Sequence, residues 1–149
     1  ISGSTIAFII VKITNLELIR LNYGEEIVAE AERKVAEILV ENRKEGDICG
    51  IFREGEFVLF ADHTNFDLVR AYGNVRAYVK ELNDKLKECC LDDDRGYIKC
   101  AVGASVYPET SDDYDELYEM AEKACEKAEH SEDARAVIYD KKEEEVSRN

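Results

Sequence analysis

Cysteine and histidine are the residue types that most often carry metal, redox or nucleophilic chemistry, and their spacing here supports none of it. The sequence has five cysteines and two histidines, without a Cys-x-x-Cys pair or a cluster spaced like zinc ligands. His63 and His130 each stand alone, and Cys89 and Cys90 are neighbours, an arrangement that rarely forms a disulfide. We therefore expect reduced thiols, as in a cytosolic domain, and no zinc site.

The net charge narrows the range of binding partners. Thirty-four acidic residues against 20 basic ones give a net charge of −14 at pH 7. A nucleic-acid polymer or an anionic membrane surface would require a basic face, so neither is an expected partner. The longest apolar run, residues 6–11, is also too short to span a bilayer.

The elements that must position any remaining chemistry follow from the hydrophobic pattern. Residues 6–13 form a β-branched apolar run, which is typical of a central strand covered on both faces. Asn15 is expected to cap a short helix through Arg20, and Gly55 to supply the positive φ of a hairpin tip. The other expected strands are 48–52, 57–60, 98–106 and 136–139, and the long helices are 25–41, 66–86 and 114–128.

This order of elements, β-α-α-β-β-α-β-α-β, predicts the fold class. We expect an α/β (α+β) sandwich with a mixed central sheet of about five strands flanked by helices, related to the ferredoxin-like βαββαβ arrangement. A chain of 149 residues is long enough for one domain, which we place at residues 5–140. Residues 1–4 are interpreted as a linker and residues 141–149 as a polar tail. Because the sequence begins at Ile1 and not at methionine, we expect a piece of a longer protein.

The hairpin tip carries a specific resemblance. Arg53-Glu54-Gly55-Glu56-Phe57 resembles the Gly-Gly-Asp/Glu-Glu-Phe signature of GGDEF domains, the diguanylate cyclase family. Three further segments are similar to family motifs in the same order along the chain: residues 11–24, residues 101–108 and residues 121–129. They match, respectively, the family's Asp-x-Asp-x-Phe-Lys-x-Ile-Asn-Asp-x-Tyr-Gly stretch, its Ser-Ile-Gly and Tyr-Pro strand, and its Ala-Asp-x-Ala-Leu-Tyr-x-Ala-Lys helix. The resemblance implies a nucleotidyl-cyclase-like fold and, for active members, synthesis of cyclic di-GMP from GTP.

The same resemblance exposes departures at the metal site. Active members are implied to hold Mg²⁺ with an aspartate that ends the first strand and with the acidic third residue of the signature. Those positions are Lys12 and Gly55 here, and neither an ammonium nor a glycine side chain can ligate Mg²⁺. Arg53 and Glu54 replace the two glycines of the signature, and only the positions of Glu56 and Phe57 agree with it.

The positions implied to contact phosphate and guanine differ as well. The lysine and asparagine of the first short helix become Glu17 and Arg20, and the guanine-binding aspartate becomes Ala29. The phosphate-binding lysine of the last long helix becomes Glu129, and the Gly-Arg-Asn after it becomes residues 132–134, Glu-Asp-Ala. Glu17 and Glu129 would repel a triphosphate. We therefore predict no catalytic residues, no metal site and no cofactor, with Mg²⁺ expected only if residual cyclase activity exists.

Two places are retained as candidate nucleotide-binding sites. Lys12 could hold a phosphate without a metal, or it could be exposed or paired with Glu56. Lys44 and Asp47 match the ends of the family's inhibitory Arg-x-x-Asp motif, which binds cyclic di-GMP. Lysine lacks the planar fork with which arginine pairs and stacks on guanine, so an ordinary polar turn is the simpler interpretation.

The sequence thus predicts a non-catalytic, degenerate GGDEF domain that acts as a regulatory or interaction module of a bacterial signalling protein. It is expected in the cytoplasm, either free or as the cytoplasmic part of a membrane-attached protein. Its expected partners are the neighbouring domains of the longer protein and a second copy in a homodimer. The alternatives are a receptor for cyclic di-GMP or GTP, and a diguanylate cyclase with residual activity in which Glu54 or Glu56 replaces the missing metal ligand.

Overall fold

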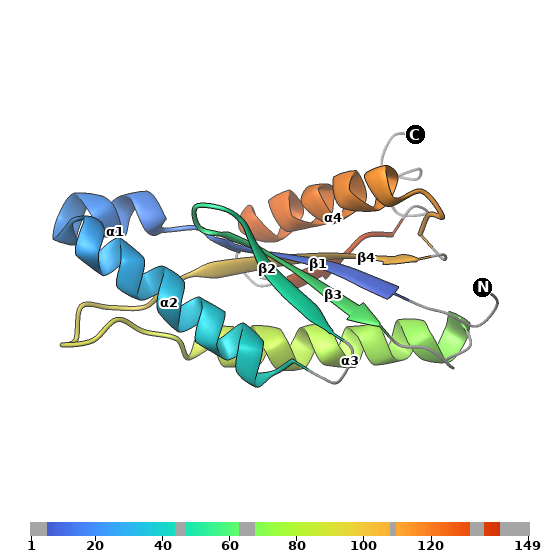
Figure 1. The fold of residues 1–149 in the computed structure, drawn as a ribbon, viewed down its shortest axis with the longest axis horizontal. Helices are drawn as coiled ribbons and strands as arrows, with labels where there is room; N and C mark the ends of the chain where they lie inside the picture. The colour runs from blue at the N-terminus through green and yellow to red at the C-terminus, as the bar shows by residue number, and fades with distance from the viewer. Residues whose placement is uncertain (1–5, 44–46, 63–67, 108–109, 132–135, 141–149) are drawn as a thin grey trace.

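The computed structural model describes residues 6–43, 47–62, 68–107, 110–131 and 136–140, which form one mixed sheet with helices on both faces (Figure 1). The sheet order is β2-β3-β1-β4-β5, and neighbouring strands are antiparallel except for the parallel pair β4 and β5. This confirms the predicted mixed five-stranded sheet. The elements are β1 (Ile6–Ile13), α1 (Leu16–Tyr23), α2 (Glu25–Glu41), β2 (Ile48–Arg53), β3 (Glu56–Asp62), α3 (Leu68–Lys87), β4 (Cys100–Tyr107), α4 (Tyr114–Glu129) and β5 (Ala136–Ile138).

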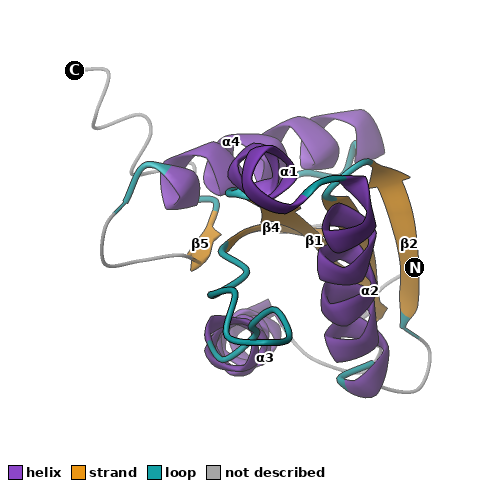
Figure 2. Ribbon diagram, turned by 90° about the vertical axis from the view of Figure 1, so that its left-hand side faces the viewer, coloured by secondary structure: helices purple, strands orange, loops and turns teal. Residues whose placement is uncertain are grey.

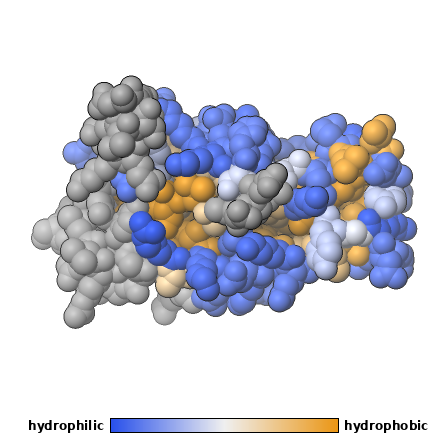
Figure 3. Space-filling view, turned by 180° about the vertical axis from the view of Figure 1, so that it is seen from behind, coloured by the Kyte–Doolittle hydropathy of each residue, from blue (hydrophilic) through white to orange (hydrophobic). Residues whose placement is uncertain are grey.

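The central strand β1 is covered on both faces, as its apolar run predicts. Its odd-numbered residues from Ala7 to Ile13 join the larger core, which α2 and α3 supply from one side. Phe8 and Ile10 face the other way and pack with Ala121, Cys125 and Ala128 of α4. Figure 2 shows the resulting layers, with α4 over one face of the sheet and α2 and α3 over the other. Seen from behind, apolar surface lies between the polar outer faces of α4 and α3 (Figure 3).

One predicted hydrogen bond and one predicted strand boundary need correction, and the side chain of Asn15 explains both. Asn15 precedes α1, but its side chain makes no capping hydrogen bond to that helix. Instead, its Nδ2 donates to the carbonyl of Tyr97, and its Oδ1 accepts from the backbone N–H of Lys99, both at 3.0 Å. Because residues 97–99 are held by Asn15 and by a bridge between Cys90 and Tyr97, β4 begins at Cys100 and not at residue 98.

Among the described residues, none of the helices has both the length and the apolar character that a membrane span requires.

The packing of α4 on the sheet depends on Gly103 of β4. A Cβ atom at this position would lie 2.2 Å from the backbone nitrogen of Cys125 and 2.4 Å from the carbonyl oxygen of Ala121. These are backbone atoms of α4, so no side-chain rotation could relieve the contact. The absence of a side chain at Gly103 therefore sets how closely α4 approaches β4 and β1.

We predict that Gly103→Ala lowers the free energy of unfolding by about 2–3 kcal/mol, because α4 must shift away from the sheet. Urea denaturation followed by circular dichroism would measure the change. Gly50→Ala is the matched control, since Gly50 also lies in a strand but a Cβ there meets nothing within 4 Å. Equal stability of the two variants would contradict the role assigned to Gly103.

Candidate functional site

The end of β1 carries an ion pair that the sequence did not predict. The Nζ atom of Lys12 lies 3.1 Å from Oε2 of Glu129, the last residue of α4. Glu56 stands opposite Lys12 in the register of β1 and β3, but its Oε2 lies 3.3 Å from Nε of Arg53. The alternatives considered from the sequence, an exposed Lys12 or a Lys12–Glu56 pair, therefore give way to a pair with α4.

This ion pair borders a cavity of about 200 Å³ between β1, the β2–β3 hairpin and α4. Four carboxylates and two cations are among the lining residues, which are Ile10, Lys12, Arg53, Glu56, Glu122, Cys125, Glu126 and Glu129. Burial alone would lower the pKa of Lys12, but the hydrogen bond and charge of Glu129 outweigh it and raise that pKa above its usual value. Lys12 is therefore a charged ammonium already bound by a carboxylate.

The thiol of Cys125 also lines this cavity and is inert at neutral pH. It is buried, and its Sγ lies 3.7 Å from the carbonyl oxygen of Ala101. Burial raises its pKa to about 12, so the nucleophilic thiolate is not populated near pH 7.

The hairpin tip places backbone where the signature would place a carboxylate. Gly55 has φ +73°, as predicted for the turn, and it is buried. Its N–H donates to Oε2 of Glu32 at 3.0 Å, and its carbonyl accepts from the N–H of Ile13 at 2.8 Å. A Cβ atom at Gly55 would lie 2.8 Å from Cδ2 of Leu16. The third signature position is thus a covered turn with a positive φ, at which a side chain would require Leu16 to move.

Arg20 joins three parts of the site through carboxylates. Its guanidinium contacts Glu17 on the same helix, Glu25 at the start of α2, where Nε to Oε1 is 2.6 Å, and Glu54 at the hairpin tip. Hydrogen bonds to these groups, the one to Glu54 first, raise the pKa of Arg20 further above its already high value. The spacing of Glu17 and Arg20 fits an i,i+3 helix pair, but only the tertiary fold brings Glu54 to them. Sequence reasoning therefore missed this cluster.

Of the two residues at the second predicted nucleotide-binding site, the structure describes only one. Lys44 lies outside the described residues. Asp47 is buried, with 6% of its surface exposed, and its Oδ2 accepts from the hydroxyl of Tyr78 on α3 at 3.4 Å. Burial first, and then the neighbouring Asp47, raise the pKa of Tyr78. The carboxylate of Asp47 is therefore engaged inside the domain. Ala29, at the position implied to contact guanine, is exposed on α2.

A magnesium ion does not fit the residues at the end of β1. An ammonium and a covered glycine stand at the two implied ligand positions, and the carboxylates nearest to Lys12 are held by Lys12 and Arg53. Across the described ranges, the chain forms no group of three or more His, Cys, Asp or Glu residues that could hold a metal ion.

The sheet order β2-β3-β1-β4-β5, with a hairpin tip beside the end of β1, defines an α+β domain of the nucleotidyl-cyclase class. The model of the family described as "Diguanylate cyclase, GGDEF domain" matches residues 2–135, which is most of the chain. The chain therefore belongs to the GGDEF domain family. No curated protein matches it.

Solved structures agree with this fold. The active GGEEF domain of a diguanylate cyclase from Vibrio cholerae is 18% identical, with a TM-score of 0.75 over 92% of this chain and 84% of that one. The GGDEF domain of YfiN from Pseudomonas aeruginosa is 13% identical, with a TM-score of 0.81 over 93% and 84%. The GGDEF domain of DgcB from Caulobacter crescentus, solved in complex with c-di-GMP, is 15% identical, with a TM-score of 0.75 over 91% and 78%.

We predict that Lys12→Gln lowers the free energy of unfolding by about 1 kcal/mol, because the partly exposed pair is lost and the facing carboxylates repel one another. The pKa of Lys12 is raised above 10.5, so the pair contributes fully below that pH and is lost only as the pH rises through the raised value. The deficit should therefore be the same at about pH 7 and about pH 9.

Urea denaturation at both pH values would measure this deficit. Lys80→Gln is the control, because Lys80 lies 3.7 Å from Asp84 with 81% of its side chain exposed, and it should lose less than half as much. A Lys12→Gln variant as stable as the unaltered chain would contradict the assigned pair.

Proposed function

We propose that this GGDEF domain is non-catalytic and serves as a regulatory or interaction module of a bacterial signalling protein in the cytoplasm. The observation that carries the proposal is the Lys12–Glu129 ion pair at 3.1 Å, at the position where the family resemblance implies a metal-binding aspartate. The ammonium of Lys12 cannot ligate a metal, and the carboxylate of Glu129 is bound to that ammonium.

The charge around the cavity supports the absence of GTP turnover. Glu56, Glu122, Glu126 and Glu129 surround it, and its two cations, Lys12 and Arg53, already bind carboxylates. A carboxylate about 4 Å from a phosphate oxygen costs roughly 4 kcal/mol at an effective dielectric constant of about 20. Without a metal to neutralise the phosphates, the cavity repels the triphosphate that the reaction requires.

Support for an interaction role comes from exposed apolar side chains. Leu18 and Leu21 of α1 are 57% and 82% exposed, and Ile48 and Ile51 of the edge strand β2 are 67% and 72% exposed. One structural neighbour, the diguanylate cyclase SiaD from Pseudomonas aeruginosa, was solved in complex with its activator SiaC. We extend this to the present chain as a proposal, with neighbouring domains of a longer protein or a second copy as its partners.

Incubation with GTP and either Mg²⁺ or Mn²⁺, followed by chromatography, should yield no cyclic di-GMP above a protein-free control, because the described residues form no metal ligand set. Glu56→Gln serves as a matched variant for the residual-cyclase alternative. Product that accumulates with the unaltered chain and disappears in Glu56→Gln would overturn the proposal.

Calorimetric titration distinguishes an interaction module that binds no nucleotide from a nucleotide receptor. With cyclic di-GMP, and with GTP in the absence of divalent metal, we expect no saturable heat, since the carboxylate of Asp47 and the ammonium of Lys12 are already engaged. Saturable cyclic di-GMP binding that Asp47→Asn removes would support the receptor alternative. GTP binding that Lys12→Gln removes would instead assign Lys12 to phosphate.

A further inference from the structure

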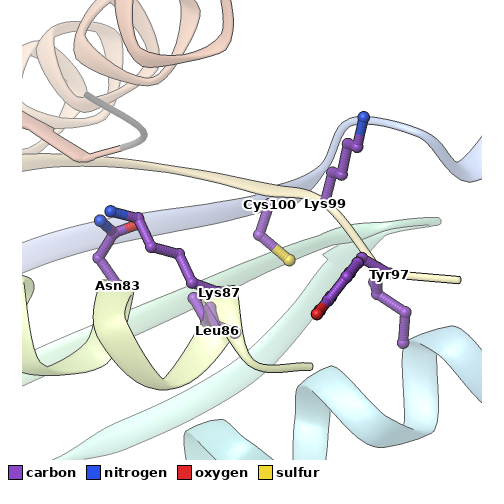
Figure 4. Close-up of a pocket in the computed structure, with 7 residues that line it drawn as sticks. Asn83, Leu86, Lys87, Tyr97, Lys99 and Cys100 are labelled. Carbon is purple, nitrogen blue, oxygen red and sulfur yellow. The ribbon is translucent and has the colours of Figure 1, made fainter. Parts of the chain in front are cut away.

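A second cavity lies on the face of the sheet covered by α3, opposite the face that holds the Lys12 cavity. Its volume is about 290 Å³, at the small end of the range for ligand pockets. It opens between the last turns of α3 and the segment that leads into β4 (Figure 4). The lining residues are Asn83, Leu86, Lys87, Tyr97, Ile98, Lys99 and Cys100.

The inner wall of this pocket is apolar. Leu86 and Ile98 are each 2% exposed and Cys100 is 7% exposed, so their side chains belong to the core. Burial raises the pKa of the Cys100 thiol to about 12, so it is a neutral wall and not a nucleophile. This wall suits the apolar body of a ligand.

Asn83 is the unusual member of the lining. Only 8% of its surface is exposed, and the described part of the chain offers its carboxamide no hydrogen-bond partner. A buried amide without a partner is costly, because it has lost its hydration without compensation. Figure 4 shows Asn83 and Lys87 on successive turns of α3, with the Tyr97 ring across the pocket and its hydroxyl directed toward α3.

Lys87 supplies a positive charge beside this amide. In the ranges that the structure covers, no carboxylate lies within ion-pair distance of its ammonium, although the chain as a whole is strongly acidic. An adjoining cavity of about 340 Å³ shares Asn83 and Lys87 and is also bordered by Arg76, Lys80, Asp84 and Asp140. Of these, Lys80 pairs with Asp84 at 3.7 Å.

We propose that the pocket binds a small organic carboxylate. The carboxylate would accept hydrogen bonds from the Asn83 amide and the Lys87 ammonium, while an aromatic or short aliphatic body lies against Leu86, Ile98 and Cys100. Lys99 also borders the pocket, but its side chain is directed away from Asn83 and Lys87 (Figure 4). The remaining ammonium and amide donor match a monoanion, whereas a dianionic phosphate would call for more positive charge. The proposal does not depend on the function proposed for the hairpin side of the domain.

Benzoate and its neutral analogue benzamide are suitable probes, titrated into the ¹⁵N-labelled chain and followed by NMR. Benzoate should shift the Asn83 side-chain amide resonances with a dissociation constant on the order of 1 mM or below, and benzamide should bind about tenfold more weakly. Lys87→Gln should reduce benzoate binding to the benzamide level. Lys85→Gln, on the same helix but outside the lining, should leave it unchanged. Equal binding of the two probes, or no saturable shift at Asn83, would overturn the proposal.

Asn83→Leu gives a second, independent readout. Removing an unpaired buried amide should raise the melting temperature by about 2–4 °C, while benzoate affinity falls by about tenfold or more. A lower melting temperature would mean that Asn83 is a structural hydrogen-bonding residue, which contradicts a ligand role.

Discussion

The close approach of α4 to β4, which only a glycine at position 103 permits, is the constraint from which the rest of the site follows. With backbone atoms of α4 so near the sheet, the acidic residues Glu122, Glu126 and Glu129 are brought to the end of β1. Lys12 then meets a carboxylate within hydrogen-bond distance instead of open solvent. Packing in the middle of the sheet thus determines which charged groups meet at the end of β1.

The hairpin completes this site from the other side by internal contacts. Its tip is held to α2 through Glu32 and Gly55, and to α1 through Arg20 and Glu54. Each contact uses a charge or a backbone group within the protein and so makes it less available to a nucleotide or metal. Cations and carboxylates are thus paired between β1 and α4, among α1, α2 and the hairpin tip, and within the hairpin.

The fold was predictable from the sequence because its patterns are strong and local. The β-branched run of β1, the amphipathic stripes of α2 and α4, and the glycine of the hairpin tip each indicate one structure, and the order of elements gives the sheet. The prediction failed at Asn15, whose cap position is correct but whose side chain bonds residues far away in sequence. Where a side chain can bond either to its own helix or to a distant segment, the tertiary structure determines which partner it takes. A local sequence pattern does not contain that information.

At the candidate site, the residue types could be read from the sequence, but the contacts that they form could not. The replacement of acidic residues by Lys12 and Gly55 is visible in the sequence alone, whereas the partner of Lys12 is 117 positions away and required the fold. We propose that the described residues between β1 and the hairpin form no metal-nucleotide site. Adding Mn²⁺ and GTP to the ¹⁵N-labelled chain and recording paramagnetic broadening tests it directly. We expect no selective broadening of the Lys12 and Gly55 amide signals. Broadening that is centred on those two residues and depends on GTP would contradict the proposal.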